Sequence, residues 1–271
     1  MKWTIGFAAA ALVASIGPAP TEHAVAAPPP EECSLALVGD SLALTLLLPL
    51  EAAIDGDHCS VTMHWNYGPL FSDTERRLAP VIDDPPDVVV VAIGIWEQAH
   101  LRGGHGIDPT AATWAAAYRN DHLQPWVDRL LETGTEVVWV GMHRTRDAEQ
   151  SATIAALNAI WSDVAADAAL TWVDGRAAVA RTLDRYVEID SAADPAMRLV
   201  ARDGYHLCRE GAVRMTGELL DALDTRFGIG RDDGWADAPW SGEELTYGAD
   251  QCPEPDQVRA GKRRFLSLDV R

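Results

Sequence analysis

Three residues near the two ends of the chain have the types and spacing needed for nucleophilic chemistry. Ser41 lies in the sequence GDSL, directly after the apolar run Leu35–Val38. Asp203 and His206 are spaced D-x-x-H ahead of a final apolar-periodic segment. An Asp can orient an imidazole whose other nitrogen takes a proton from a serine hydroxyl, and this arrangement activates the serine for attack. Imidazole suits the role of base because it titrates near neutral pH.

Each motif also has a plainer interpretation. Asp40 or Ser41 could do no more than cap the helix that the sequence predicts over Leu42–Ile54. The D-x-x-H segment could be a surface turn with a solvated Asp and an ordinary His. The position of Ser41 favours a catalytic role. Ligands of open parallel sheets lie beyond the carboxyl ends of the strands, which is where Ser41 is expected.

The elements that must position these residues alternate along the chain. Val88–Ile93 is an unbroken apolar run rich in β-branched residues, which is typical of a strand covered on both faces. Alternating strands and helices imply right-handed βαβ units, so we expect a three-layer α/β/α sandwich with a five-stranded parallel sheet. Pro125 should kink or split the helix over 109–132. The predicted strands are Leu35–Val38, Ser60–Trp65, Val88–Ile93, Glu136–Gly141 and Leu170–Val173, and the other predicted helices are Asp147–Ala166 and Glu210–Phe227.

Length and composition indicate one domain, and the first 26 residues indicate export. The 271 residues, 48% of them hydrophobic, suffice for a single large core. Residues 1–26 combine a positive start, an apolar run too short to span a membrane and small residues before a cleavage point, as a secretory signal peptide does; an uncleaved anchor is the alternative. We expect a Pro-rich lead-in at 27–32, the domain at 33–228 and an irregular tail packed on it at 229–271.

The net charge limits the possible partners, and the number of cysteines indicates disulfides. A net charge of −19 repels nucleic acid and anionic membranes, so neither a nucleic-acid partner nor stable membrane insertion is expected after cleavage. Export makes disulfides the default for the four cysteines, which allow three pairings. No two cysteines have C-x-x-C spacing, which disfavours a metal site.

The two end motifs, in this order, resemble the SGNH or GDSL-type hydrolase family, secreted bacterial type. The resemblance extends over about Cys33 to Phe227 and rests on GDSL at 39–42 and D-x-x-H at 203–206. It implies a flavodoxin-like sandwich, no metal or organic cofactor, and ester substrates that are small molecules, lipids or carbohydrates. It makes Ser41 the nucleophile, His206 the base and Asp203 its partner, in an enzyme expected to be a monomer.

The resemblance also implies an oxyanion hole, and here the sequence departs from the family. Family members use the serine backbone N–H, a Gly after the second strand, which Gly68 matches, and an Asn in a G-x-N-D turn. The chain reads IGIWEQ, with Gly94 matching, Trp96 in place of Asn and Glu97 in place of Asp. Losing one donor typically costs about 10²–10³ in rate. Either the indole N–H donates, another group replaces it, or the enzyme is slow; Trp96 could equally serve only as a wall of the pocket. Further candidates for substrate binding are Asp40, Gly94, Glu97 and His143.

The implied architecture also suggests two disulfides. Cys33 and Cys59 would lie at the amino ends of neighbouring strands, and a Cys208–Cys252 bridge would join the catalytic loop to the tail. The expected function is a secreted serine esterase that hydrolyses acyl or acetyl esters. The alternatives are an O-acyltransferase that modifies cell-envelope polysaccharide and a degenerate binding domain that keeps the fold without turnover.

Overall fold

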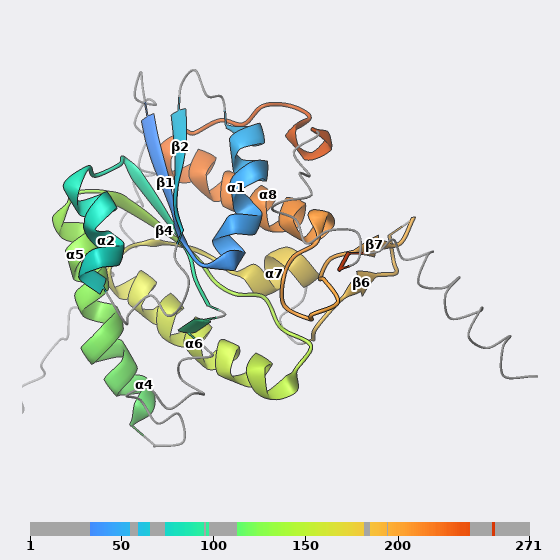
Figure 1. Cartoon of the computed structure of the whole chain (residues 1–271), viewed down its shortest axis with the longest axis horizontal. Coiled ribbons are helices and arrows are strands. Elements are labelled where there is room, and N and C mark those ends of the chain that lie inside the picture. Colours follow the sequence, from blue (N-terminus) through green and yellow to red (C-terminus); the bar gives the residue numbers. More distant parts are fainter. Residues whose placement is uncertain are drawn as a thin grey trace, which may run out of the picture.

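The chain folds around a five-stranded parallel sheet with the strand order β2-β1-β3-β4-β5 (Figure 1). The computed structural model describes residues 33–54, 59–65, 74–94, 96–97, 113–181, 185–193, 195–238 and 251–252. The three-layer α/β architecture predicted from the sequence is confirmed. The sheet consists of β1 (Cys33–Gly39), β2 (Cys59–Trp65), β3 (Val88–Ala92), β4 (Glu136–Val140) and β5 (Thr171–Val173).

Helices cover both faces of the sheet, and an antiparallel pair of short strands lies outside it (Figure 1). This pair, which sequence analysis did not predict, consists of β6 (Ile189–Asp190) and β7 (Met197–Arg198). The α-helices are α1 (Ser41–Ala53), α2 (Thr74–Asp83), α4 (Trp114–Ala117), α5 (Gln124–Glu132), α6 (Ala148–Asp167), α7 (Gly175–Ala180) and α8 (Arg209–Phe227), with a π-helix, η2 (Tyr118–Leu123), and a 3-10 helix, η3 (Trp235–Asp237).

Alternation along β1 shows how the sheet is buried on both sides. Leu35 and Leu37 face a core formed with α1, α7 and α8, whereas Ala36 and Val38 face a second core formed with α2, α5 and α6. Because successive side chains of a strand point to opposite faces, an unbroken apolar run fills both cores. The strands are therefore held rigidly, and the loops at their carboxyl ends have fixed starting points.

The long helix predicted over 109–132 is divided in the structure. Residues 101–112 lie outside the described part of the chain, and from Trp114 onward α4 passes into the π-helix η2 and then into α5. Pro125 lies in the first turn of α5, as a residue without a backbone N–H prefers. The wider π turn just before it accommodates the proline without ending the helix.

Both predicted disulfides are present. Cys33 and Cys59 are directly paired in the parallel register of β1 and β2, with their Cα atoms 4.3 Å apart. Cys208 and Cys252 have Cα atoms 5.7 Å apart and join the start of α8 to the tail. The described part of the tail also contacts the domain through Trp235, which packs into the core beside α1. Within the described residues, no helix is both long and apolar enough to cross a membrane.

Candidate active site

The turn from β1 to α1 places Ser41 at the carboxyl edge of the sheet. A Cβ atom on Gly39 would lie 2.0 Å from the carbonyl oxygen of Ala92, so the close approach of β1 to β3 requires glycine here. Asp40 is the N-cap of α1, and its Oδ1 accepts a hydrogen bond of 2.9 Å from the backbone N–H of Leu42. Ser41 is therefore the first helical residue, and its side chain is half-buried.

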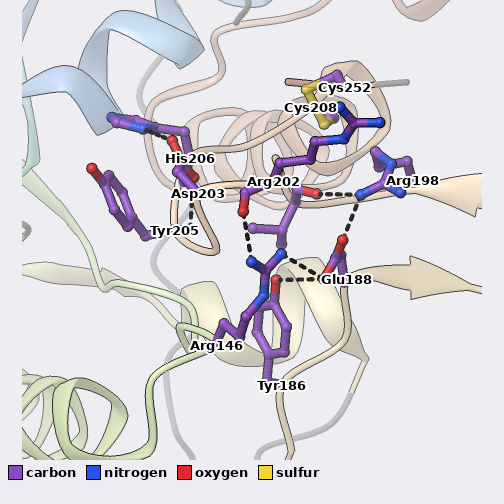
Figure 2. A network of polar contacts seen from close by, with 11 residues as sticks. Arg146, Tyr186, Glu188, Arg198, Arg202, Asp203, Tyr205, His206, Cys208 and Cys252 are labelled. Atoms are coloured by element: carbon purple, nitrogen blue, oxygen red, sulfur yellow. Dashed lines mark hydrogen bonds and ion pairs between the residues drawn. A yellow bond between two sulfur atoms is a disulfide. The ribbon is translucent and has the colours of Figure 1, made fainter. Parts of the chain in front are cut away.

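The loop before α8 brings Asp203 and His206 to this serine, although His206 is 165 residues further along the chain. The Nε2 atom of His206 lies 2.8 Å from the Ser41 Oγ, and its Nδ1 lies 2.6 Å from the Asp203 Oδ2. The other carboxylate oxygen, Oδ1, accepts backbone N–H hydrogen bonds from Tyr205, at 3.0 Å, and from His206, at 3.1 Å. Figure 2 shows the Asp203–His206 pair on this loop.

The electrostatics of the pair indicate which nitrogen of the imidazole carries the hydrogen. Burial raises the pKa of Asp203, but hydrogen bonds from the His206 ring and from two backbone N–H groups outweigh burial and lower that pKa to about 2. Asp203 is therefore a carboxylate at neutral pH and accepts from Nδ1–H of the imidazole. That tautomer leaves Nε2 as the acceptor for the Ser41 hydroxyl proton.

Tyr205 contacts the imidazole directly, and sequence analysis did not identify it. Its ring centroid lies 4.4 Å from that of His206, with the two rings tilted by 51° (Figure 2). Packing of this kind limits the rotation of the imidazole. The available signal was an aromatic residue inside the D-x-x-H motif, between the two residues already singled out.

Asp40 joins the turn that carries Ser41 to the segment after β3. Its Oδ2 accepts hydrogen bonds from the backbone N–H groups of Gly94, at 3.2 Å, and Trp96, at 3.3 Å. Burial raises the pKa of Asp40, and the three N–H donors, Leu42 included, offset this effect only in part. The carboxyl group is enclosed by backbone, so Asp40 positions two segments of the site.

Trp96 and Glu97, which replace the Asn and Asp of the family pattern, lie in different environments. The backbone N–H of Trp96 donates to Asp40, whereas the residue as a whole is 38% exposed. Glu97 is 1% exposed and lies in the interior. The indole is thus the part of Trp96 that is open to a ligand. Gly68, the other predicted oxyanion donor, lies outside the described residues.

Burial argues against direct substrate contact by the four other candidate residues. Asp40, Gly94, Glu97 and His143 are all buried in this structure. A buried group whose polar atoms face the protein interior supports the site and does not form its surface. For His143, burial lowers the pKa to about 4, so its ring is neutral at physiological pH. The residues that flank these four candidates in the sequence give no sign of whether their side chains are buried or exposed, so sequence analysis did not predict their burial.

No metal centre accompanies these residues in the part of the chain that the structure describes, where no three His, Cys, Asp or Glu side chains gather around a common point. The parallel sheet, the serine after β1 and the Asp-His pair before α8 have the arrangement expected from the resemblance to the SGNH hydrolase family. Residues 34–222 match the family described as "Protein of unknown function (DUF459)". The chain belongs to that family.

Solved structures with the same fold are distant in sequence. An acetyl xylan esterase, AlAXEase, is 18% identical with a TM-score of 0.52, over 70% of this chain and 99% of that one. A putative GDSL-like lipase from Parabacteroides merdae is 15% identical with a TM-score of 0.54, over 72% and 97%. A variant of the acetyl-xylooligosaccharide esterase Axe2, from Geobacillus stearothermophilus, is 16% identical with a TM-score of 0.51, over 70% and 94%. No curated protein sequence matches the chain.

Proposed function

We propose that this chain is a serine esterase that hydrolyses carboxylic esters. The observation that carries the proposal is the continuous hydrogen-bonded line from Ser41 Oγ through the imidazole of His206 to the Asp203 carboxylate, with distances of 2.8 and 2.6 Å. A helix cap needs no imidazole, and a solvated surface turn needs no serine, so the two plainer interpretations do not account for this contact.

In the proposed reaction, the Ser41 Oγ attacks the ester carbonyl carbon while His206 Nε2 takes the hydroxyl proton. The C–O bond to the leaving alcohol then breaks, and the imidazolium returns the proton to that alcohol. Water, deprotonated by the same imidazole, then attacks the acyl carbon. The bond between that carbon and Ser41 Oγ breaks, the carboxylic acid is released, and the imidazolium returns the proton to Oγ. Asp203 stays ionised throughout and stabilises the imidazolium.

The negative charge on the carbonyl oxygen needs donors near Ser41. The backbone N–H of Ser41 is one, because the first N–H groups of a helix have no partner within the helix and carry the positive end of its dipole. Gly68 remains the predicted second donor. The Trp96 backbone N–H is held by Asp40, so its indole N–H is the group that could take the place of the usual Asn.

The exposed Trp96 ring favours a substrate with a carbohydrate moiety. An exposed aromatic face on the segment after β3, whose backbone is bonded to Asp40 next to Ser41, can stack on a sugar ring, and two proteins of the same fold are described as acetyl xylan or acetyl-xylooligosaccharide esterases. We therefore propose acyl or acetyl groups on sugars as the first substrates to test, with lipid and small-molecule esters next. Transfer to a sugar hydroxyl in place of water is the alternative outcome. Export, which the disulfides favour, is part of the proposal.

Labelling with a fluorophosphonate tests the proposal. The intact chain should gain one covalent adduct on Ser41, located by peptide mass spectrometry, and Ser41→Ala should gain none. Folded wild-type protein that does not react would indicate the degenerate binding domain. A series of p-nitrophenyl esters of increasing chain length then measures acyl preference, and product analysis with a sugar acceptor separates hydrolysis from transfer.

A further inference from the structure

A charged network contacts the loop that carries Asp203 (Figure 2). Arg146 lies between β4 and α6, and its Nη1 donates to the carbonyl oxygen of Arg202 at 2.6 Å. Its backbone N–H donates to the carbonyl oxygen of Gly204 at 2.9 Å. These two carbonyl groups belong to the residues immediately before and after Asp203. Arg146 therefore holds Asp203 on both sides through the backbone.

The loop is shaped to admit Arg146 at this point. Gly204 has a φ of +89°, in the left-handed region that favours glycine. A Cβ atom on Gly204 would lie 2.6 Å from the Cβ of Arg146, so any side chain there would collide with it. The conformation after Asp203 and the position of Arg146 thus depend on each other.

Glu188 in turn holds the Arg146 guanidinium. Its Oε2 accepts from Arg146 Nη2 at 2.8 Å, and its Oε1 accepts from Arg198 Nη1 at 2.6 Å. Tyr186 donates to the same carboxylate at 3.4 Å. Burial raises the pKa of Glu188, but the two arginines outweigh burial and lower it, so the carboxylate stays charged. Arg198 is 6% exposed, and the network is therefore anchored in the core at one end.

The opposite side of the loop is held by the tail. The backbone N–H of Arg202 donates to the carbonyl oxygen of Gln251 at 2.8 Å, and the neighbouring residue Cys252 is bonded to Cys208. The loop from 202 to 208 is thus fixed by a covalent bond at one end and by the Arg146 contacts at the other. Of these supports, Arg146 is the one whose bonds flank Asp203.

We propose that Arg146, oriented by Glu188, is a positioning residue that sets the contact between Asp203 and His206. The inference rests on the proposed esterase function. The imidazolium formed during attack needs the carboxylate at hydrogen-bond distance, and a displacement of about 1 Å in such a site can cost about 100-fold in rate. Because the Arg146–Glu188 pair belongs to a network anchored in the core, the free energy of unfolding of each variant is measured beside kcat, so that an effect on catalysis is separated from one on folding.

The test compares variants of the full chain at a temperature well below their unfolding transitions. Arg146→Ala removes the guanidinium. Arg146→Lys keeps the positive charge but has one nitrogen in place of the two that bond the Arg202 carbonyl and Glu188. Glu188→Gln removes the negative charge that orients Arg146. Arg231→Ala is the matched control, because Arg231 forms a 2.7 Å ion pair with Asp221 and is 45% exposed, close to the 47% of Arg146. For each, kcat and KM for p-nitrophenyl acetate and the rate of fluorophosphonate labelling are measured.

We expect Arg146→Ala to lower kcat by about 10–100-fold with a change in KM below about twofold, since only the geometry of proton transfer is lost. Arg146→Lys and Glu188→Gln should show smaller losses, and Arg231→Ala none. Adding ethylguanidinium at low concentration should restore part of the activity of Arg146→Ala. Combining Arg146→Ala with Glu188→Gln should add little to the first loss, because both act through the same contact.

Wild-type kcat in the folded Arg146 and Glu188 variants would overturn the inference. So would a loss that follows the unfolded fraction and does not respond to ethylguanidinium, since that result assigns Arg146 a role in stability alone. If Arg146→Ala does not fold, Arg146→Lys and Glu188→Gln decide by the same criteria. A wild-type chain that is neither labelled nor active would refute the proposed function, and this inference with it.

Discussion

Replacing Asp40 with alanine should destabilise the protein far more than removing an ordinary helix cap. Its carboxylate accepts N–H hydrogen bonds from Leu42, Gly94 and Trp96, and so joins α1 to the segment after β3. Alanine leaves all three donors without this acceptor. The substitution therefore loses a cap and a tether between two elements far apart in sequence.

The expected loss can be estimated from these contacts. An N-cap is worth about 0.5–2 kcal/mol, and a buried N–H left without an acceptor costs about 1–3 kcal/mol. The Gly94 N–H is buried, whereas that of Trp96 is partly buried and can reach water. Burial raises the pKa of Asp40, which shows that desolvation disfavours its charged form. Removing the carboxylate relieves this cost and so reduces the expected loss. We therefore expect Asp40→Ala to lower the free energy of unfolding by about 2–4 kcal/mol.

Urea unfolding at neutral pH measures this loss, with Asp147→Ala as the control. Asp147 caps α6 at an exposed site, where its Oδ1 accepts from the Gln150 N–H at 2.7 Å, so its loss should be about 1 kcal/mol. Asp40→Asn keeps an acceptor without the charge and should lie between wild type and Asp40→Ala. Equal losses in the two alanine variants would refute the reasoning, because the bonds from Gly94 and Trp96 would then contribute nothing.

Three further outcomes are expected. The stability advantage of wild type over Asp203→Asn should be present above pH 3.8 and decline as pH falls toward 2, because the folded pKa of about 2 is below the ordinary value; urea unfolding across this range measures it. Trp96→Ala should raise KM for acetylated oligosaccharides by about 3–10-fold while p-nitrophenyl acetate is little affected, and Leu131→Ala, at a comparably exposed apolar residue, should change neither. Replacing Cys208 and Cys252 together by serine should lower the free energy of unfolding by about 2–4 kcal/mol in the same assay.

The strands and main helices could be predicted because their signals are local. Val88–Ile93 and Glu136–Gly141 are apolar runs flanked by turn residues, and each corresponds to its strand, β3 or β4, except for one residue at the carboxyl end. That the first two strands are neighbours was expected from the family resemblance and not from the runs themselves. The helices α2 and α7 were missed because one carries an internal proline, Pro80, and the other has only six residues.

Features that depend on distant contacts could not be predicted. The strands β6 and β7 have two residues each, too few for any period to be visible. Arg146 and Glu188 are 42 residues apart and, as single charged residues, give no sign that they meet. For the same reason sequence analysis treated Asp40 and Glu97 as candidates for the surface of the site, because burial depends on which segments pack over them.

The disulfide between Cys33 and Cys59 has a consequence for self-association. Within the described sheet β2 is an outermost strand, and such strands can leave their own sheet and add to that of another molecule. The bond links β2 to β1 at the first residue pair of their shared register. If two copies exchanged their β2 strands, each β2 would still be bonded to the β1 of its own chain, so the exchange would require this bond to break or would leave the two chains interlocked. The disulfide therefore disfavours domain swapping at this edge of the sheet.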